Sequence, residues 1–335
     1  MLNSKAVNIV WLKRDLRSQD HAPLLKAECA GIPYIIIYLF EPSRIDYPDT
    51  SQRHLQFVYH SIVSLDKVLS EFNRRVELFY GEAVEVLNFL IKELDIISVF
   101  SYQESGTQVS WERDKKIKQF CKSNQIIWEE SQRDGIVRGI KNRKDWNKKW
   151  HLKMHTPIIK NKYTTSEETH LEHPFQMPSI LESQLKYYPS RYQPAGEDNA
   201  WRYLNSFTNQ RGFNYQRHIS KPMESRMSCS RLSPYLAWGN MSVKQAFQFI
   251  GTHTKDTRNN KAFSAMLTRL HWHCHFIQKF EMECRYETEC INSGYEILPH
   301  EKNEAFIKAW KTGTTGYPLI DACMRAVEST GWINF

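Results

Sequence analysis

Short apolar stretches alternate with longer amphipathic stretches over the first 130 residues of this 335-residue chain. The short stretches are rich in β-branched and aromatic residues and have the length of buried strands. The longer stretches carry apolar residues at helical spacing. The pattern predicts strands at residues 8–12, 34–40, 76–80, 96–102 and 126–129, and helices at residues 22–30, 52–72, 84–94 and 111–123. Strands and helices in this alternation predict a doubly wound parallel sheet.

The composition changes after residue 130. Residues 131–196 are rich in Lys, Tyr and Pro, which indicates a long connector held on the surface by its aromatic side chains. Helical spacing then returns and predicts helices at residues 197–210, 233–237, 243–253, 262–284, 303–311 and 316–329. We therefore predict an α/β domain at residues 1–130, a connector at residues 131–196 and an all-helical domain at residues 197–335.

Bulk properties exclude several classes of protein. The seven cysteines have no paired spacing and no charged-then-apolar leader precedes Val7, so we expect neither a disulfide framework nor export. The longest apolar run, residues 33–40, is far shorter than the roughly 18 residues that span a bilayer. We expect a cytoplasmic monomer that does not act at a membrane.

The net charge of +8 lies in one part of the connector. Residues 131–163 contain ten Lys and Arg against two Asp, and the rest of the chain is balanced. The basic side chains of this segment include Lys141, Arg143, Lys148 and Lys149, interleaved with Trp146 and Trp150. Contact with a DNA phosphate backbone would use such a pattern. A solvated helix face that is docked by its tryptophans explains it equally well.

A dense charged motif, Trp11-Leu-Lys-Arg-Asp-Leu-Arg17, directly follows the first predicted strand and precedes Asp20. It should therefore lie at the carboxyl edge of the sheet, where ligands and domain contacts gather. Without further context, a salt-bridged loop is the simpler interpretation.

A cluster of small hydroxyl residues, Ser228-Cys-Ser-Arg-Leu-Ser-Pro234, precedes a predicted helix. Free N–H groups and hydroxyls at a helix start can bind an anion. Simple N-capping by Ser230 or Ser233 is the more common role of such residues.

A histidine-rich helix is predicted around Leu270-His-Trp-His-Cys-His-Phe276. His271 and His275 lie four residues apart, but Trp272 stands where a zinc-peptidase motif needs Glu, and no third ligand is evident. We therefore expect no metal here, and predict a cavity-lining or core helix.

These strings, together with Thr315-Gly-Tyr-Pro-Leu-Ile-Asp-Ala-Cys-Met-Arg325 and Gly331-Trp332, resemble the DNA photolyase/cryptochrome family in order and spacing over essentially the whole chain. The resemblance implies an N-terminal antenna domain and a C-terminal FAD-binding domain, which would be incomplete because the chain ends at Phe335 before the family's remaining flavin-contacting segments.

The resemblance assigns roles to individual residues. It implies that Tyr215 contacts the adenine half of FAD, that the hydroxyl-rich string holds the pyrophosphate, and that helix and C-terminal residues line the flavin pocket. The implied FAD-binding residues are Tyr215, Cys229, Ser230, Arg231, Leu232, Ser233, Trp272, His275, Trp332 and Phe335.

The same resemblance implies that Trp272 stacks on a pyrimidine pair extruded from DNA, which makes Trp272 and Arg269 the candidate catalytic residues and Arg269, Trp272 and His273 candidate DNA contacts. Arg269 stands where repair enzymes usually keep Glu or Gln, and His273 where they usually keep Arg. His300 falls at the position of the outermost tryptophan of the family's electron-transfer chain.

The implied activity is light-driven repair of pyrimidine dimers in DNA by electron transfer from reduced FAD, with a folate or deazaflavin as a possible antenna chromophore. The changes at Arg269, His273 and His300 favour a second interpretation, a cryptochrome-like photoreceptor without repair activity. The end of the chain at Phe335 favours a third, an inactive truncated fragment.

Overall fold

The computed structural model describes residues 6–167, 171–254, 260–299 and 301–334. Its strands are β1 (Ala6–Leu12), β2 (Tyr34–Phe40), β3 (Val76–Tyr80), β4 (Asp95–Tyr102) and β5 (Ile127–Ser131). They form one parallel sheet in the order β3-β2-β1-β4-β5. The strand order reverses between β1 and β4, so the doubly wound parallel sheet expected from the sequence is confirmed.

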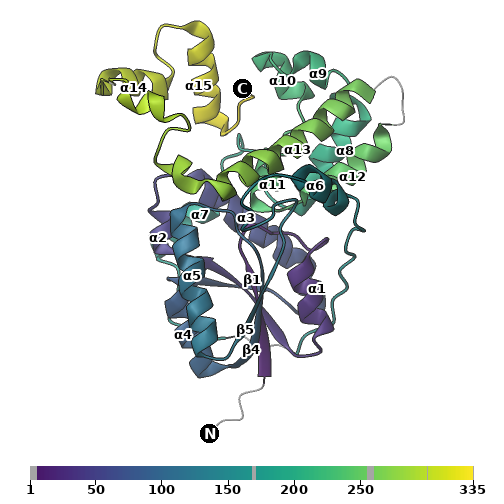
Figure 1. Cartoon of the computed structure of the whole chain (residues 1–335). Coiled ribbons are helices and arrows are strands. Elements are labelled where there is room, and N and C mark those ends of the chain that lie inside the picture. The colour runs from purple at the N-terminus through teal and green to yellow at the C-terminus, as the bar shows by residue number, and fades with distance from the viewer. Residues whose placement is uncertain (1–5, 168–170, 255–259, 300, 335) are drawn as a thin grey trace.

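Alternate side chains of the strands pack against two layers of helices. Val10 and Leu12 of β1 face α1 (Ala22–Cys29) and α3 (Gln52–Leu69). Ile9 and Trp11 face α4 (Ala83–Glu93) and α5 (Gln108–Ser123) on the opposite side of the sheet (Figure 1). Both faces are therefore buried, which explains why the strands read as nearly continuous apolar runs.

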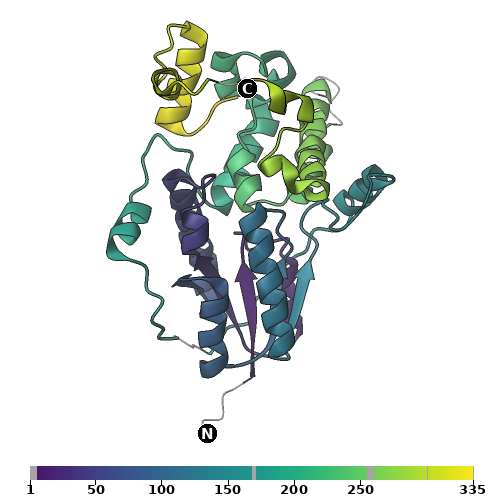
Figure 2. The same ribbon diagram turned by 60° about the vertical axis from the view of Figure 1, so that its left-hand side comes forward.

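The helical part of the chain covers the carboxyl end of the sheet (Figure 2). No helix among the described residues is long and apolar enough to cross a bilayer. The helices are α8 (Glu197–Ser206), α9 (Tyr215–His218), α10 (Pro222–Ser228), α11 (Ser233–Trp238), α12 (Val243–His253), α13 (Asn260–Met282), α14 (Glu304–Thr312) and α15 (Pro318–Thr330).

The predicted connector contains two helices, α6 (Trp146–Met154) and α7 (Ser179–Lys186). A helix docked by its tryptophans was one of the two interpretations of the basic segment, whereas α7 was not predicted. Trp146 and Trp150 are buried in the core of the helical part, where they pack with α13. The buried side chains of α6, Trp146, Trp150 and Met154, follow the four-residue spacing of one helix face.

Helix α5 begins at Gln108, three residues before the predicted start. Thr107 occupies the N-cap position but its side chain makes no capping bond. Instead the carboxylate of Glu287 accepts the Gln108 N–H at 2.7 Å. A cap supplied by a residue so distant in sequence leaves no local signal.

The charged motif after β1 joins the two parts of the molecule. The Leu16 N–H donates to the Trp238 carbonyl at 3.1 Å, and Arg17 Nη1 donates to the Gly239 carbonyl at 3.1 Å. Asp20 pairs with Lys244 Nζ at 2.8 Å. The salt-bridged-loop interpretation is therefore confirmed, with partners in the helical part.

A buried His21–Asp15 pair within this junction should make stability depend on pH. His21 Nε2 lies 2.8 Å from Asp15, and His21 Nδ1 accepts the Leu24 N–H, so the imidazole is neutral. Burial lowers the pKa of His21 despite Asp15. The unfolded chain takes up a proton below a pKa of about 6.5, so we expect stability to fall there by up to about 1.4 kcal/mol per pH unit.

Urea unfolding from pH 7.5 to pH 5 measures this dependence. His21→Gln should reduce the slope of the profile by up to about 1.4 kcal/mol per pH unit, whereas His155→Gln, a change at an exposed histidine, should leave it unchanged. An equally steep profile in His21→Gln would exclude His21 as its source.

Candidate functional site

The loop between α10 and α11, residues 228–233 and here called the serine loop, has free backbone donors. Arg231 adopts a left-handed conformation (φ 60°) and Leu232 a right-handed one (φ −82°, ψ −11°). Consecutive residues of opposite hand form a concavity that suits an anion. Among the described residues no acceptor binds the N–H groups of Ser230, Arg231 or Ser233, and Ser230 Oγ accepts the Leu232 N–H at 3.4 Å.

Three arginines surround the serine loop. The guanidinium of Arg231 lies 4.6 Å from the Trp332 ring, and that of Arg226 lies 5.7 Å from the same ring. Burial lowers the pKa of Arg211 and of Arg231. The charge of Arg231 lowers the pKa of Arg211 further, and the charge of Arg226 lowers the pKa of Arg231 further. No carboxylate of the described residues pairs with any of the three. Positive charge without a counter-charge favours binding of an anionic group.

A second group of predicted residues lies on α9 and α13. Tyr215 is buried, and burial raises its pKa to about 12 against the opposing effect of a hydrogen bond with Arg269. The Arg269 guanidinium lies 4.5 Å from the ring of Trp272, which is 44% exposed. Tyr215, Arg269 and Trp272 therefore run in order from the core to the surface.

A cavity of about 290 Å³ adjoins the serine loop. Ser233 and Trp332 line it together with aromatic side chains from α3, from the segment before α8 and from α11. Gln193 ties this cavity to the loop, because its Nε2 donates to the Arg231 carbonyl at 2.5 Å and its Oε1 accepts from Arg231 Nε at 3.2 Å. The volume is near the lower end of typical ligand sites, about 300–1,000 Å³.

Several predicted residues do not join this arrangement. His275 contacts Arg143 at 2.7 Å and the Trp146 ring, on the flank of α13 that faces α6. His273 faces the Arg133–Asp134 segment, burial lowers its pKa, and its Nε2 is buried with no partner among the described residues. His300 and Phe335 lie outside the described residues.

The basic segment has two distinct faces. Trp146 and Trp150 are buried, with ring centroids 5.1 and 4.7 Å from His271. The basic side chains predicted to contact DNA, Lys141, Arg143, Lys148 and Lys149, are all exposed. The tryptophans thus dock α6, as the interpretation of a solvated, docked helix face expected. DNA contact through the exposed side chains stays a prediction.

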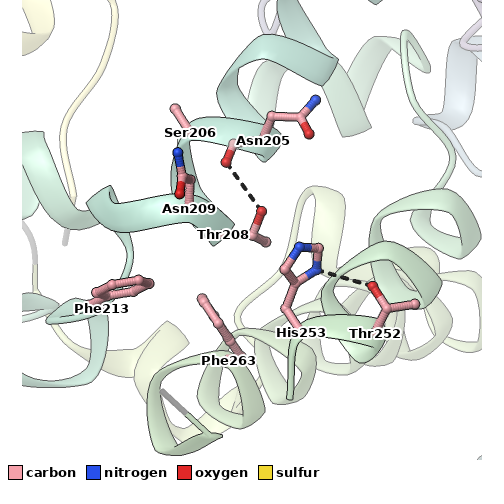
Figure 3. A pocket seen from close by; sticks show the side chains of 8 residues that line it. All are labelled: Asn205, Ser206, Thr208, Asn209, Phe213, Thr252, His253 and Phe263. Carbon is pink, nitrogen blue, oxygen red and sulfur yellow. Dashed lines mark hydrogen bonds between the residues drawn. The ribbon is translucent and has the colours of Figure 1, made fainter. Parts of the chain in front are cut away.

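A larger cavity, of about 620 Å³, lies between α12, α13 and the π-helical segment Phe207–Arg211 that follows α8 (Figure 3). Asn205, Thr208, His253 and Phe263 are among the side chains that point into it. No residue assigned from the sequence lines this cavity, so it lies apart from the candidate site.

Sequence reasoning missed Arg211. Its guanidinium donates to the carbonyls of Cys229 and Ser230 in the serine loop. The local pattern gave no signal because the π-helical turn changes the direction of this side chain. The one available signal was Gly212, where a Cβ would lie 2.6 Å from the Phe207 ring.

Comparison with known proteins agrees with this geometry. The family model described as DNA photolyase matches residues 8–178, and that described as FAD binding domain of DNA photolyase matches residues 266–335. The deoxyribodipyrimidine photo-lyase of Vibrio cholerae is 24% identical over 98% of this chain and 73% of its own length. The cryptochrome-1 of Gallus gallus is 23% identical over 98% of this chain and 57% of its own length.

Solved structures share the fold. A class III photolyase from Agrobacterium tumefaciens superposes with a TM-score of 0.82 at 21% identity, covering 100% of this chain and 71% of its own. An archaeal photolyase from Sulfolobus tokodaii, described with two FAD molecules, gives a TM-score of 0.76 at 24% identity over 98% of this chain and 72% of its own. Since one family model alone spans half of the sequence, this chain belongs to the DNA photolyase/cryptochrome family.

Proposed function

We propose that this protein binds FAD and uses light to repair pyrimidine dimers in DNA. The observation that carries the proposal is the serine loop, where partly buried arginines without carboxylate partners among the described residues surround free backbone donors. A pyrophosphate supplies the negative charge and the acceptor oxygens that this arrangement lacks. The match of residues 266–335 to the photolyase FAD-binding domain supports FAD as its source.

Each group of residues has a separate task in this proposal. Bound, reduced FAD would supply the electron that splits a dimer after light absorption. Arg231 and the serine loop hold the pyrophosphate, while Tyr215 and Trp332 flank the remainder of the cofactor. Trp272 offers an exposed ring on which an extruded base pair can stack. The basic face of α6 contacts the phosphate backbone.

The serine hydroxyls provide a direct test of cofactor binding. Ser230→Ala with Ser233→Ala should raise the Kd for FAD by about a hundredfold or more, because two hydrogen bonds to a charged group are lost. Fluorescence titration with FAD measures this. The matched double change Ser70→Ala with Ser123→Ala, on exposed serines of the α/β part, should leave the Kd unchanged. Equal Kd values for both double variants would remove the serine loop as the phosphate site.

The repair activity is tested with a dimer-containing oligonucleotide. Illumination with the FAD-loaded protein should restore intact thymines, and Trp272→Ala should weaken binding of the lesion by about tenfold through loss of stacking. Trp310→Ala, which removes another exposed tryptophan on α14, is the control. Persistence of the dimers under light with fully loaded protein would contradict a repair function.

One observation favours a photoreceptor as the second candidate. Arg269 places a cation 4.5 Å from Trp272, where the family's repair enzymes usually carry Glu or Gln. A reversed charge beside the stacking ring would alter how an electron-rich lesion is held. A protein whose flavin responds to light while dimers remain intact would have this second function.

The family implies an antenna chromophore, a folate or deazaflavin, but protein side chains fill the crevice in which we would expect it. The β1/β4 switch point is where ligands bind in doubly wound sheets. Here Lys13 is fully buried with its Nζ 3.4 Å from Asp114, and Arg113 pairs with Glu41 at 2.9 Å and Glu104 at 2.7 Å. These ion pairs satisfy one another, so a ligand would have to displace them.

The neighbouring space is small. Two cavities lie at this edge of the sheet, one of about 170 Å³ lined by Arg14, Arg44 and Trp238, and one of about 270 Å³ lined by Arg17, Tyr102 and Lys244. Both are below the roughly 300 Å³ of small ligand sites. We therefore propose that light reaches the bound FAD directly. Purified protein reconstituted with folate or deazaflavin should retain only the flavin, and a second bound chromophore would contradict this.

A further inference from the structure

Arg211 is held in an unusual position by the chain around it. It ends the π-helical segment Phe207–Arg211, in which the wider turn changes the direction of each side chain. The following residue must be glycine, because a Cβ at Gly212 would meet the Phe207 ring and carbonyl at 2.6 Å. The side chains of this segment diverge. Thr208 lines the 620 Å³ cavity (Figure 3), whereas Arg211 donates to the Ser230 carbonyl of the serine loop.

All the hydrogen bonds of the Arg211 guanidinium go to neutral oxygens. Nε donates to Ser206 Oγ at 3.1 Å, and Nη2 donates to the Tyr203 carbonyl at 2.8 Å and the Ser230 carbonyl at 3.2 Å. Nη1 donates to the carbonyls of Met227, at 3.3 Å, and Cys229. The rigid fork of an arginine therefore grips two consecutive carbonyls of the serine loop.

These hydrogen bonds to the carbonyls also orient the N–H groups of the same peptide units. In a trans peptide the carbonyl and the next residue's N–H point in opposite directions. Turning the Cys229 and Ser230 carbonyls toward Arg211 therefore turns the N–H groups of Ser230 and Arg231 away from it. These are two of the N–H groups that have no acceptor among the described residues.

We propose that Arg211 is a positioning residue for the cofactor: it holds the serine loop so that its N–H groups face the FAD pyrophosphate. Arg211 does not itself touch the phosphates in this arrangement. Its charge, which no carboxylate of the described chain neutralises, lies behind the loop and adds to the attraction for an anion. This inference rests on the proposed binding of FAD at the serine loop.

Arg211→Lys tests the inference, because lysine keeps the charge but cannot grip two carbonyls at once. The Kd values for FAD, inorganic pyrophosphate and riboflavin are measured by titration of the full chain. We expect FAD and pyrophosphate to bind about ten- to a hundredfold more weakly and riboflavin, which has no phosphate, to be unaffected. Arg217→Lys, at an exposed arginine on α9, is the matched control.

A second variant covers the case in which Arg211→Lys does not fold. Ser206→Ala removes only the exposed acceptor of Nε and should weaken pyrophosphate binding by about two- to fivefold. Unchanged FAD and pyrophosphate affinities in both variants, or an equal loss for FAD and riboflavin, would overturn the positioning role. Wild-type protein that binds pyrophosphate but not FAD would overturn the proposed function and leave the role of Arg211 intact.

Discussion

Gly239→Ala should lower the free energy of unfolding by at least about 3 kcal/mol. Gly239 follows α11 in the left-handed region (φ 74°), which costs an L-residue about 1–2 kcal/mol. A Cβ there would also lie 2.1 Å from the Arg14 carbonyl oxygen and 2.6 Å from the Asp15 Cα. Because both neighbours are backbone atoms at the junction of the two parts, the chain cannot relieve the clash by a rotamer change. Urea unfolding followed by circular dichroism measures the loss.

Gly251→Ala is the matched control. Gly251 lies within α12, and an added Cβ has no atom within 4 Å. Alanine should therefore stabilise the protein by about 0.5–1 kcal/mol through its better helix propensity. If both substitutions changed stability alike, the close approach of Gly239 to the motif after β1 would not hold the two parts together.

The same junction connects stability to the candidate site. The cavity beside the serine loop is lined from both sides of the junction, by His54 and Phe57 of α3 and by Pro234 and Trp238 of α11. The α11 side also provides the Trp238 carbonyl that accepts the Leu16 N–H. A change that separates the two parts should therefore disturb the cavity as well as the fold.

The sheet was predictable because its signals are local. Each strand is a short apolar run bounded by polar residues, and β2 and β3 have the predicted bounds. Side chains of both parities are buried in this sheet, so the apolar runs are nearly unbroken. Burial on both faces thus made the strands visible in the sequence without any knowledge of their partners.

The connector was less predictable because its order comes from tertiary contacts. Helix α6 is strongly basic and becomes a helix of the fold through Trp146 and Trp150, whose partners lie on α13. Pro-rich composition correctly indicated a surface segment but concealed α7, whose single buried side chain is Leu185. Local composition therefore indicated a surface segment, whereas the helices in it depend on packing against residues far away in the sequence.

Part of the candidate site was also predictable from the sequence, and part was not. The order of the motifs predicted that Ser233, Arg231 and Trp332 belong to one site, and the structure places them around one loop and cavity. Helical spacing alone could not tell which flank of α13 faces that neighbourhood, so His275 was grouped with residues from which the structure separates it. Arg211 depends on a π-helical turn, for which the sequence carries no periodic signal.

Neutralising the exposed basic side chains on α6 and in the segment just before it should abolish most of the DNA affinity. Lys141, Arg143, Lys148 and Lys149 are exposed, and no carboxylate among the described residues is bonded to them. Each phosphate contact contributes a slope of about 0.9 to the dependence of log K on log salt, or about eightfold in affinity at 0.1 M relative to 1 M salt. Replacing all four with Gln should therefore weaken binding by roughly a thousandfold at 0.1 M salt and reduce the slope by roughly 3 to 4.

The control carries the same change of net charge on another face. Lys115, Lys116, Lys118 and Lys122 are exposed on α5, which covers the sheet away from α6 (Figure 1). Their replacement by Gln should leave the salt slope almost unchanged, because general attraction depends on net charge while counterion release depends on contacts. Equal losses from the two sets would mean that α6 binds no phosphates and that its lysines only keep a docked helix solvated. A loss confined to the α6 set would place the DNA backbone along α6, which Trp146 and Trp150 anchor to α13, the helix that carries Trp272.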